Sequence, residues 1–113
     1  MPEQNLQNVI SLLTICRKAG RLLLGFDAAA EAMKAKQAEL ILITTDISPK
    51  TEKEVRFYAG KNGAVTVCRL PFEMNALTVY FRKKTGVFTV TDGGFAAKLK
   101  TLLNAETETE TDT

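Results

Sequence analysis

The side chains that most often carry catalysis are scarce in this sequence. Histidine, the commonest general base and a common metal ligand, is absent, as are a His-Glu helical metal motif and a Gly-Lys-Ser/Thr phosphate loop. Asp46 and Asp92 each follow a predicted strand, where open α/β sheets bind ligands, and two such carboxylates could hold a magnesium ion. Each aspartate also precedes a predicted helix, which favours a capping role. We therefore expect no catalytic residue, no cofactor and no metal site.

Cationic side chains are the chemistry that the sequence does concentrate. Lysine and arginine supply sequence-independent affinity for the phosphates of nucleic acids. A run of cations in one loop can equally be solvated surface, so the interpretation depends on several groups lying near element ends. The three groups are Arg17, Lys18 and Arg21; Lys34 and Lys36; and Arg82, Lys83 and Lys84.

A glycine-led helix start at Gly25-Phe26-Asp27 adds a second kind of phosphate site. The first turn of a helix exposes N–H groups without intrahelical partners, and these groups bind anions. Asp27 is placed to touch base edges. Phe26 could stack on a base, but the sequence favours it as the anchor of its helix in the core.

Helices alternate with short apolar strands along the chain. Helical periodicity, a glycine after the first helix and a Ser-Pro helix start mark the helices, while apolar runs bounded by turn residues mark the strands. This alternation predicts an α/β fold with one central sheet and helices on both faces. The predicted helices cover residues 4–18, 26–36, 49–61, a stretch opening at 71, and 92–103; the predicted strands cover 21–25, 39–44, 64–68 and 87–91.

Length and charge indicate one domain with a short tail. The 113 residues suffice for one core. Four of the 13 acidic residues lie in 106–112, which leaves 15 basic and nine acidic side chains, a net charge of +6, in residues 1–105. We expect a single RNA-binding domain at 1–105 and a disordered acidic tail at 106–113. Without a secretory signal or a membrane span, a cytoplasmic location is expected, and Cys16 and Cys68 are expected to be free thiols.

The order of these segments resembles the kink-turn-binding ribosomal-protein family of the L-seven-Ae and L-thirty-e type, and within it the small bacterial members of the YlxQ type. The resemblance lies in residues 17–25, followed by a helix and then residues 38–46. Residues 46–51 and 90–96 are similar to the bacterial branch specifically. It spans about residues 6–103.

The resemblance implies a three-layer α/β/α sandwich around a four-stranded mixed sheet, and binding of a sharply bent RNA stem with tandem G·A pairs. In the family, a glycine lets the second helix enter the RNA groove, and the residues after it recognise the G·A pairs. The loop before the last strand makes a second contact, and basic residues at the first turn meet phosphates. By position, these residues are Gly25, Phe26, Asp27 and Ala28; Arg82, Lys83, Lys84, Thr85, Gly86 and Val87; and Arg17, Lys18 and Arg21.

The chain departs from the family pattern at three places. Asp27 and Ala28 stand where the family carries an Asn-Glu pair, so one base-recognising carboxylate is missing. Leu24 replaces a lysine before the glycine. Leu77 and Phe81 replace glycines in the fourth helix and make it bulkier.

The leading prediction is non-enzymatic binding of structured RNA, associated with the ribosome or translation, by a monomer, with a dimer left open. The alternative is a protein-interaction module on the same fold, using exposed apolar bulk from Leu77, Tyr80 and Phe81. RNA binding requires the cationic loop at 82–84 and the amino end of the second helix to share one exposed edge.

Overall fold

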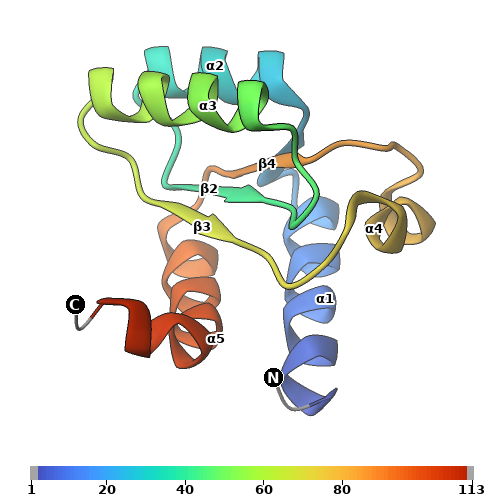
Figure 1. The fold of residues 1–113 in the computed structure, drawn as a ribbon. Coiled ribbons are helices and arrows are strands. Elements are labelled where there is room, and N and C mark those ends of the chain that lie inside the picture. Colours follow the sequence, from blue (N-terminus) through green and yellow to red (C-terminus); the bar gives the residue numbers. More distant parts are fainter. Residues whose placement is uncertain (1–2, 112–113) are drawn as a thin grey trace.

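Five helices alternate with four strands within residues 3–111, the part of the chain that the computed structural model describes (Figure 1). Side chains are described for residues 5–103. None of the described helices is both long and apolar enough to cross a membrane. In order, the elements are α1 (Glu3–Lys18), β1 (Leu22–Leu24), α2 (Phe26–Lys34), β2 (Leu40–Ile43), α3 (Pro49–Lys61), β3 (Val67–Arg69), α4 (Met74–Phe81), β4 (Val87–Val90) and α5 (Gly93–Thr111).

The four strands form one mixed sheet in the order β1-β4-β2-β3. The last strand, β4, lies between β1 and β2 and is antiparallel to both, with Leu24 and Leu42 both opposite Phe88. The edge strand β3 is parallel to β2. Because β4 inserts next to β1, the loop that precedes β4 is brought to the end of β1, where α2 begins.

The sheet is covered on both faces, which confirms the predicted three layers. Helices α2 and α3 lie on one face, α1 and α5 on the other, and α4 lies at one end of the sheet (Figure 1). Alternate residues of β2 supply the two cores: Leu40 and Leu42 join the α1/α5 side, whereas Ile41 and Ile43 join the α2/α3 side. A strand apolar on both faces is what a covered central position requires.

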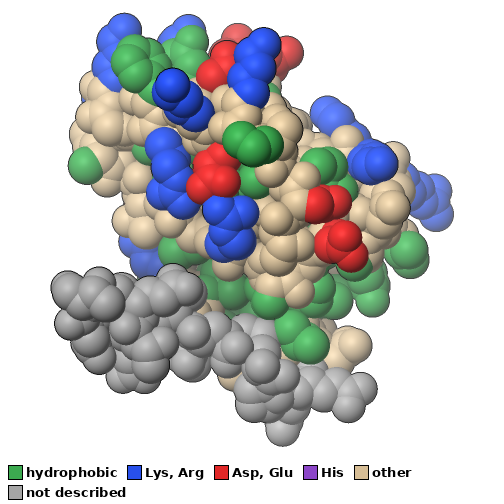
Figure 2. Space-filling model, in the orientation of Figure 1, with side chains coloured by type: hydrophobic (Ala, Val, Ile, Leu, Met, Phe, Trp, Pro, Cys, Tyr) green, Lys and Arg blue, Asp and Glu red, His purple; other side chains and the backbone are tan. Residues whose placement is uncertain are grey.

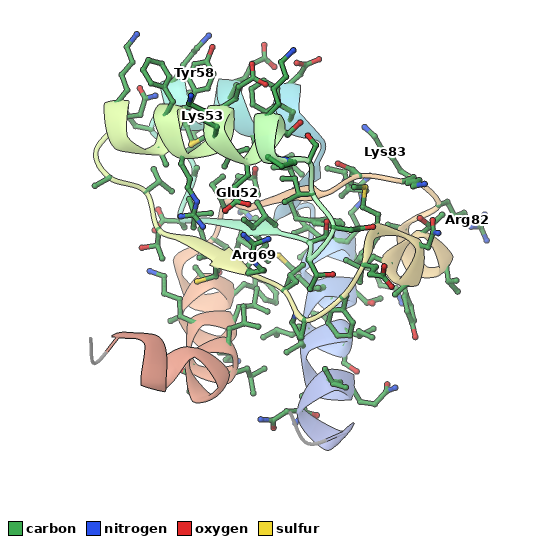
Figure 3. All side chains as sticks on the ribbon, viewed as in Figure 1. Glu52, Lys53, Tyr58, Arg69, Arg82 and Lys83 are labelled. Atoms are coloured by element: carbon green, nitrogen blue, oxygen red, sulfur yellow. The ribbon has the colours of Figure 1, made fainter. Side chains whose placement is uncertain are left out.

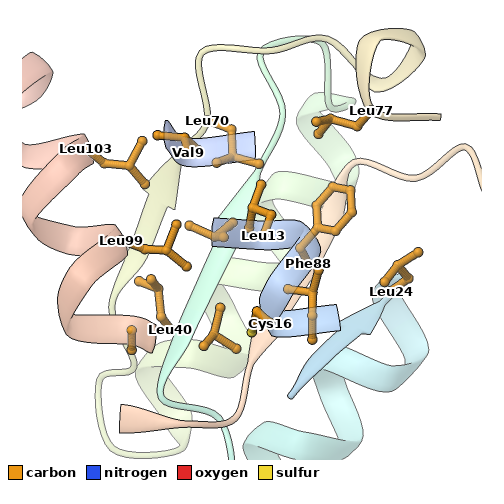
Figure 4. Close-up of a cluster of buried hydrophobic side chains, with 14 residues drawn as sticks. Val9, Leu13, Cys16, Leu24, Leu40, Leu70, Leu77, Phe88, Leu99 and Leu103 are labelled. Atoms are coloured by element: carbon orange, nitrogen blue, oxygen red, sulfur yellow. The ribbon is translucent and has the colours of Figure 1, made fainter. Parts of the chain in front are cut away.

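Phe88 is the largest fully buried side chain of the core on the α1/α5 side (Figure 4). Its ring packs against Phe81 with the two ring centroids 5.6 Å apart. Cys16 is fully buried in the same cluster, and burial raises the pKa of its thiol to about 11. Cys68 is partly buried, and both cysteines are free, as expected.

The local signals at two helix ends are confirmed. Gly20 closes α1 with a φ of 74°, and the Arg21 amide donates a hydrogen bond to the Cys16 carbonyl at 2.9 Å. At the start of α3, Ser48 accepts a hydrogen bond from the Thr51 amide at 3.1 Å, and proline occupies the first turn.

Strand β3 begins later than predicted. The sequence indicated a strand at 64–68, but β3 spans Val67–Arg69. Ala64 has a φ of 57°, so the turn after α3 continues through it. Pairing with β2, in which Val67 lies opposite Ile41, decides where the strand starts.

Helix α4 also begins later, at Met74 rather than at Pro71. The Thr45 amide donates to the Phe72 carbonyl at 2.9 Å, which keeps this stretch outside the helix. Asp46 then caps the helix: its carboxylate accepts from the Met74 amide at 3.0 Å, and this hydrogen bond lowers the pKa of Asp46.

Helix α5 extends beyond the predicted end near residue 103 and reaches Thr111. The side chains of the acidic tail lie outside the described residues. The expected disorder of residues 106–113, and the domain boundary at 105, therefore stay predictions.

Candidate nucleic-acid interface

Gly25 joins β1 to α2 in a backbone conformation that needs glycine. Its φ of 102° and ψ of 161° fall in a region that other residues almost never occupy. Its amide donates to the Val87 carbonyl at 2.9 Å, and its carbonyl accepts from the Ala29 amide at 3.2 Å to begin the helix. The amino end of α2 is thereby held against the start of β4.

Lys83 brings the loop after α4 to the same place. Its Nζ lies 3.5 Å from the Leu24 carbonyl oxygen, and a Cβ atom added to Gly25 would lie 3.2 Å from that Nζ. Figure 3 shows Lys83 near the end of the α2/α3 layer. We call the hollow between the two segments the basic notch; it is lined by Leu24, Gly25, Phe26, Asp27, Ala28, Lys83, Lys84 and Thr85.

The basic notch combines three kinds of polar group. No side chain caps α2 within the described residues, so its first amides point outward without an intrahelical partner. Lys83 and Lys84 are exposed and supply positive charge. Asp27, exposed in the first turn of α2, supplies an acceptor. Such a site suits a ligand that carries phosphates together with hydrogen-bond donors. The requirement that the 82–84 loop and the amino end of α2 share one exposed edge is confirmed.

The loop itself is held at both ends. Arg82 ends α4 in the left-handed conformation, with φ 56° and ψ 28°, and its amide donates to the Thr78 carbonyl at 2.7 Å. At the other end Gly86 is buried, and a Cβ atom there would lie 3.0 Å from Thr44 Oγ1. Val87 is 2% exposed. Gly86 and Val87 therefore hold the loop in place, and their side-chain positions are buried; the contact role predicted for them stays a prediction.

The first basic group lies outside the basic notch. Arg21 precedes β1, four residues of extended chain from Gly25 or about 13 Å, and it lies beside Glu39 and Thr91. Arg17 donates a hydrogen bond from Nη1 to the Leu22 carbonyl at 2.8 Å and so helps to fix β1. Lys18, at the end of α1, is exposed.

The two aspartates considered as metal ligands lie at opposite ends of the sheet. Asp46 follows β2 and Asp92 follows β4, and these strands are antiparallel neighbours. Asp92 accepts from the Phe95 amide at 3.0 Å, so each carboxylate caps a helix. Among the side chains described, no three Cys, Asp or Glu residues gather as metal ligands. A shared magnesium site at these aspartates is ruled out by geometry.

The prediction of an exposed apolar surface on α4 is largely wrong. Leu77 is 1% exposed, and Phe81 packs on Phe88 in the core. Tyr80 is 46% exposed, and Val79, which the sequence did not single out, is 78% exposed. The extra bulk of this helix fills the core rather than forming a broad partner surface.

Sequence reasoning named Lys34 on α2 but missed the aromatic side chains of α3 that lie beside it. Phe57 is 62% exposed, and Tyr58 beside it is half-buried. Lys61 Nζ lies 5.7 Å from the Phe57 ring centroid, and Lys34 Nζ lies 5.2 Å from that of Tyr58. Two consecutive aromatics in a helix were the available signal, but they do not tell which of the two rings is exposed.

Cations extend from the basic notch over this layer. In Figure 2, blue Lys and Arg side chains gather over α2 and α3 and at the end of the molecule where the loop after α4 lies.

Comparisons with known proteins agree with this fold. A profile of the ribosomal protein L7Ae/L30e/S12e/Gadd45 family matches residues 7–100. The RNA-binding protein YlxQ of Enterococcus faecium is 29% identical over 104 residues, which cover 91% of this chain and 98% of that protein.

Two solved structures share the fold. A Bacillus halodurans protein of unknown function matches with a TM-score of 0.76 and 24% identity, over 85% of this chain and 96% of its own. The Giardia lamblia 15.5kD RNA binding protein matches with a TM-score of 0.72 and 18% identity, over 93% of this chain and 92% of its own.

Proposed function

Because the chain belongs to the ribosomal protein L7Ae/L30e/S12e/Gadd45 family, we propose that it binds structured RNA through the basic notch and does not act as an enzyme. The observation that carries this proposal is the approach of Lys83 Nζ to the Leu24 carbonyl, which joins a cationic loop to a bare helix start. The proposed RNA is a kink-turn or related bent stem. Association with the ribosome or translation, a cytoplasmic location and a monomeric state remain predictions.

The polar groups of the basic notch have different roles. Phosphates would meet the first amides of α2 together with Lys83 and Lys84, while the Asp27 carboxylate would accept hydrogen bonds from a base. Leu24 places its side chain in the core, so the cation that the family carries there is absent. Lys83 supplies an ammonium beside the same residue and would replace it.

A second contact would extend along β1. Arg21 is exposed about 13 Å from Gly25, and Lys18 is exposed at the end of α1. Only an RNA that reaches beyond the basic notch could touch them. This spacing favours a stem over a single bound nucleotide.

The proposal is tested by fluorescence anisotropy with two labelled RNAs, a kink-turn stem and a straight duplex of the same composition. We expect binding to the kink-turn to be about tenfold tighter or more, and to weaken steeply between about 50 and 200 mM salt as bound counterions are released. No binding of either RNA at the lower salt would overturn the proposal. Equal binding of both would leave RNA binding standing and remove kink-turn specificity.

Arg82 offers a variant in which RNA binding should weaken without any loss of stability. The left-handed conformation costs a non-glycine residue about 1 kcal/mol, and Arg82 adopts it at an exposed position. We expect Arg82→Gly to leave the urea-unfolding free energy equal or higher, and to weaken RNA binding by about fivefold through loss of the guanidinium. A parallel fall in stability and affinity would mean that Arg82 is merely a structural cap.

A further inference from the structure

Three aromatic rings lie in contact on the outer layer of the molecule. The Phe26 and Tyr58 ring centroids are 5.9 Å apart, and those of Tyr58 and Phe57 are 5.7 Å apart, both in edge contacts. We call these three rings, with Lys34 and Lys61 above two of them, the aromatic strip. Figure 3 shows Tyr58 in the α2/α3 layer.

The aromatic strip exposes more aromatic surface than packing of the core requires. The buried residues of α3 are Val55 and Ala59, and these join the core beneath α2 and α3. Phe57 takes no place in that core and leaves 62% of its surface exposed. Phe26 and Tyr58 pack partly against that core. Phe57 and Tyr58 each also have a lysine ammonium over the ring, so the strip is cationic as well as aromatic.

The aromatic strip is continuous with the basic notch, because Phe26 belongs to both. A polymer held in the notch would therefore reach Tyr58 and Phe57 without leaving the surface. Glu31 and Glu54 are also exposed. Glu31 lies about one turn before Lys34 on α2, and Glu54 lies about one turn before Phe57 on α3. They would repel phosphates there and favour a path towards Lys34 and Lys61, at the carboxyl ends of the helices.

We propose that the aromatic strip binds unpaired nucleotides that flank the RNA stem, with bases stacked on Phe57 and Tyr58 and phosphates on Lys34 and Lys61. This inference rests on the proposed function. Aromatic rings that alternate with cations are the chemistry of single-stranded nucleic-acid platforms, since every base has a face to stack. Exposed lysine side chains change rotamer within nanoseconds, so a base can take the place of an ammonium over a ring while that ammonium moves to a phosphate.

The test compares three RNAs in anisotropy titrations: a blunt kink-turn stem, and the same stem with a short uridine extension at either its 5′ or its 3′ end. One of the two extensions is expected to raise affinity by about 5- to 100-fold, the gain from stacking one base. Phe57→Ala should lower that gain by about fivefold or more, the contribution of one stacked base, and leave the affinity for the blunt stem unchanged. The folded state should persist, because the Phe57 side chain is largely exposed.

Val79→Ala is the matched control, since Val79 is an exposed apolar residue on α4. It should retain the full gain from the extension. Stem binding with no gain from either extension would overturn the inference, and would leave this face to another partner such as a protein. If the stem itself does not bind, the proposed function fails. In that case the protein is titrated with oligouridine alone, and unchanged tyrosine fluorescence would overturn the inference about the aromatic strip as well.

Discussion

Reversal of two charges, in the variant Lys83→Glu/Lys84→Glu, is expected to weaken binding of a kink-turn stem by about 100-fold or more. Each lysine would lose a charge-assisted hydrogen bond worth about 1.5–3 kcal/mol, and each glutamate would repel phosphates. Both side chains are exposed and lie in the basic notch. The slope of log affinity against log salt should fall by about two, one for each phosphate that the protein no longer neutralises. Anisotropy titrations over a salt series measure both quantities.

The matched control is Lys98→Glu/Lys100→Glu, which changes the net charge equally on α5, across the sheet from α2 and α3 (Figure 1). It should alter affinity by less than about fivefold, because screening limits the effect of distant charges. Equal weakening in both variants would show that only overall charge matters. The basic notch would then not be the RNA site.

The second large effect is expected from Gly25→Ala. The φ of 102° at Gly25 is strained for any residue with a Cβ, and that atom would lie 3.2 Å from Lys83 Nζ. We expect the free energy of unfolding to fall by about 1–3 kcal/mol. RNA binding should also fall, by about tenfold, because relief of the backbone strain at Gly25 would shift the first turn of α2 relative to Lys83. Urea unfolding and anisotropy measure the two effects.

Gly60→Ala makes the same chemical change where glycine is not required. Gly60 lies in α3, and an added Cβ would meet no atom within 4 Å. There alanine should raise the free energy of unfolding by about 0.5–1 kcal/mol and leave RNA binding unchanged. Stabilisation by both substitutions would contradict the conformational role assigned to Gly25.

The Lys83→Glu/Lys84→Glu and Gly25→Ala variants act on one feature of the topology. The strand order places β4 between β1 and β2, and the Gly25 amide donates to the Val87 carbonyl across that junction. The loop before β4 and the start of α2 are therefore held by the sheet, and the backbone that carries Lys83 does not have to be ordered when RNA arrives. A preformed site saves the conformational entropy that a flexible loop would lose on binding.

The departures from the family pattern have unequal consequences. Leu77 and Phe81 are absorbed into the core, so the fold accommodates them. Ala28 lacks the carboxylate that the family carries at that position, and Asp27 is the one acidic residue among those that line the basic notch. Weaker discrimination between bases is the consequence we expect from that change, with phosphate binding retained.

Much of the fold followed from local sequence. The apolar stretch at β2, the Ser48-Pro49 start of α3 and the glycine that closes α1 act through neighbours in the chain, so they were predictable. The predicted class, layers and element order are confirmed for this reason. The groups of cations were visible too, but their relative positions were expected only from a family resemblance.

The tertiary structure alone decided what depends on distant pairs. Lys83 and Leu24 are 59 residues apart, and Asp46 caps a helix 28 residues away, so no local pattern could place them. The same is true of Leu77, buried by the sheet end beneath α4, and of Phe57, left exposed because Val55 and Ala59 take the inner face of α3. Sequence thus determined which segments become helices and strands, because local hydrogen bonding and periodicity act over a few residues. Strand pairing determined which of their side chains meet, because register joins segments that are far apart in the chain.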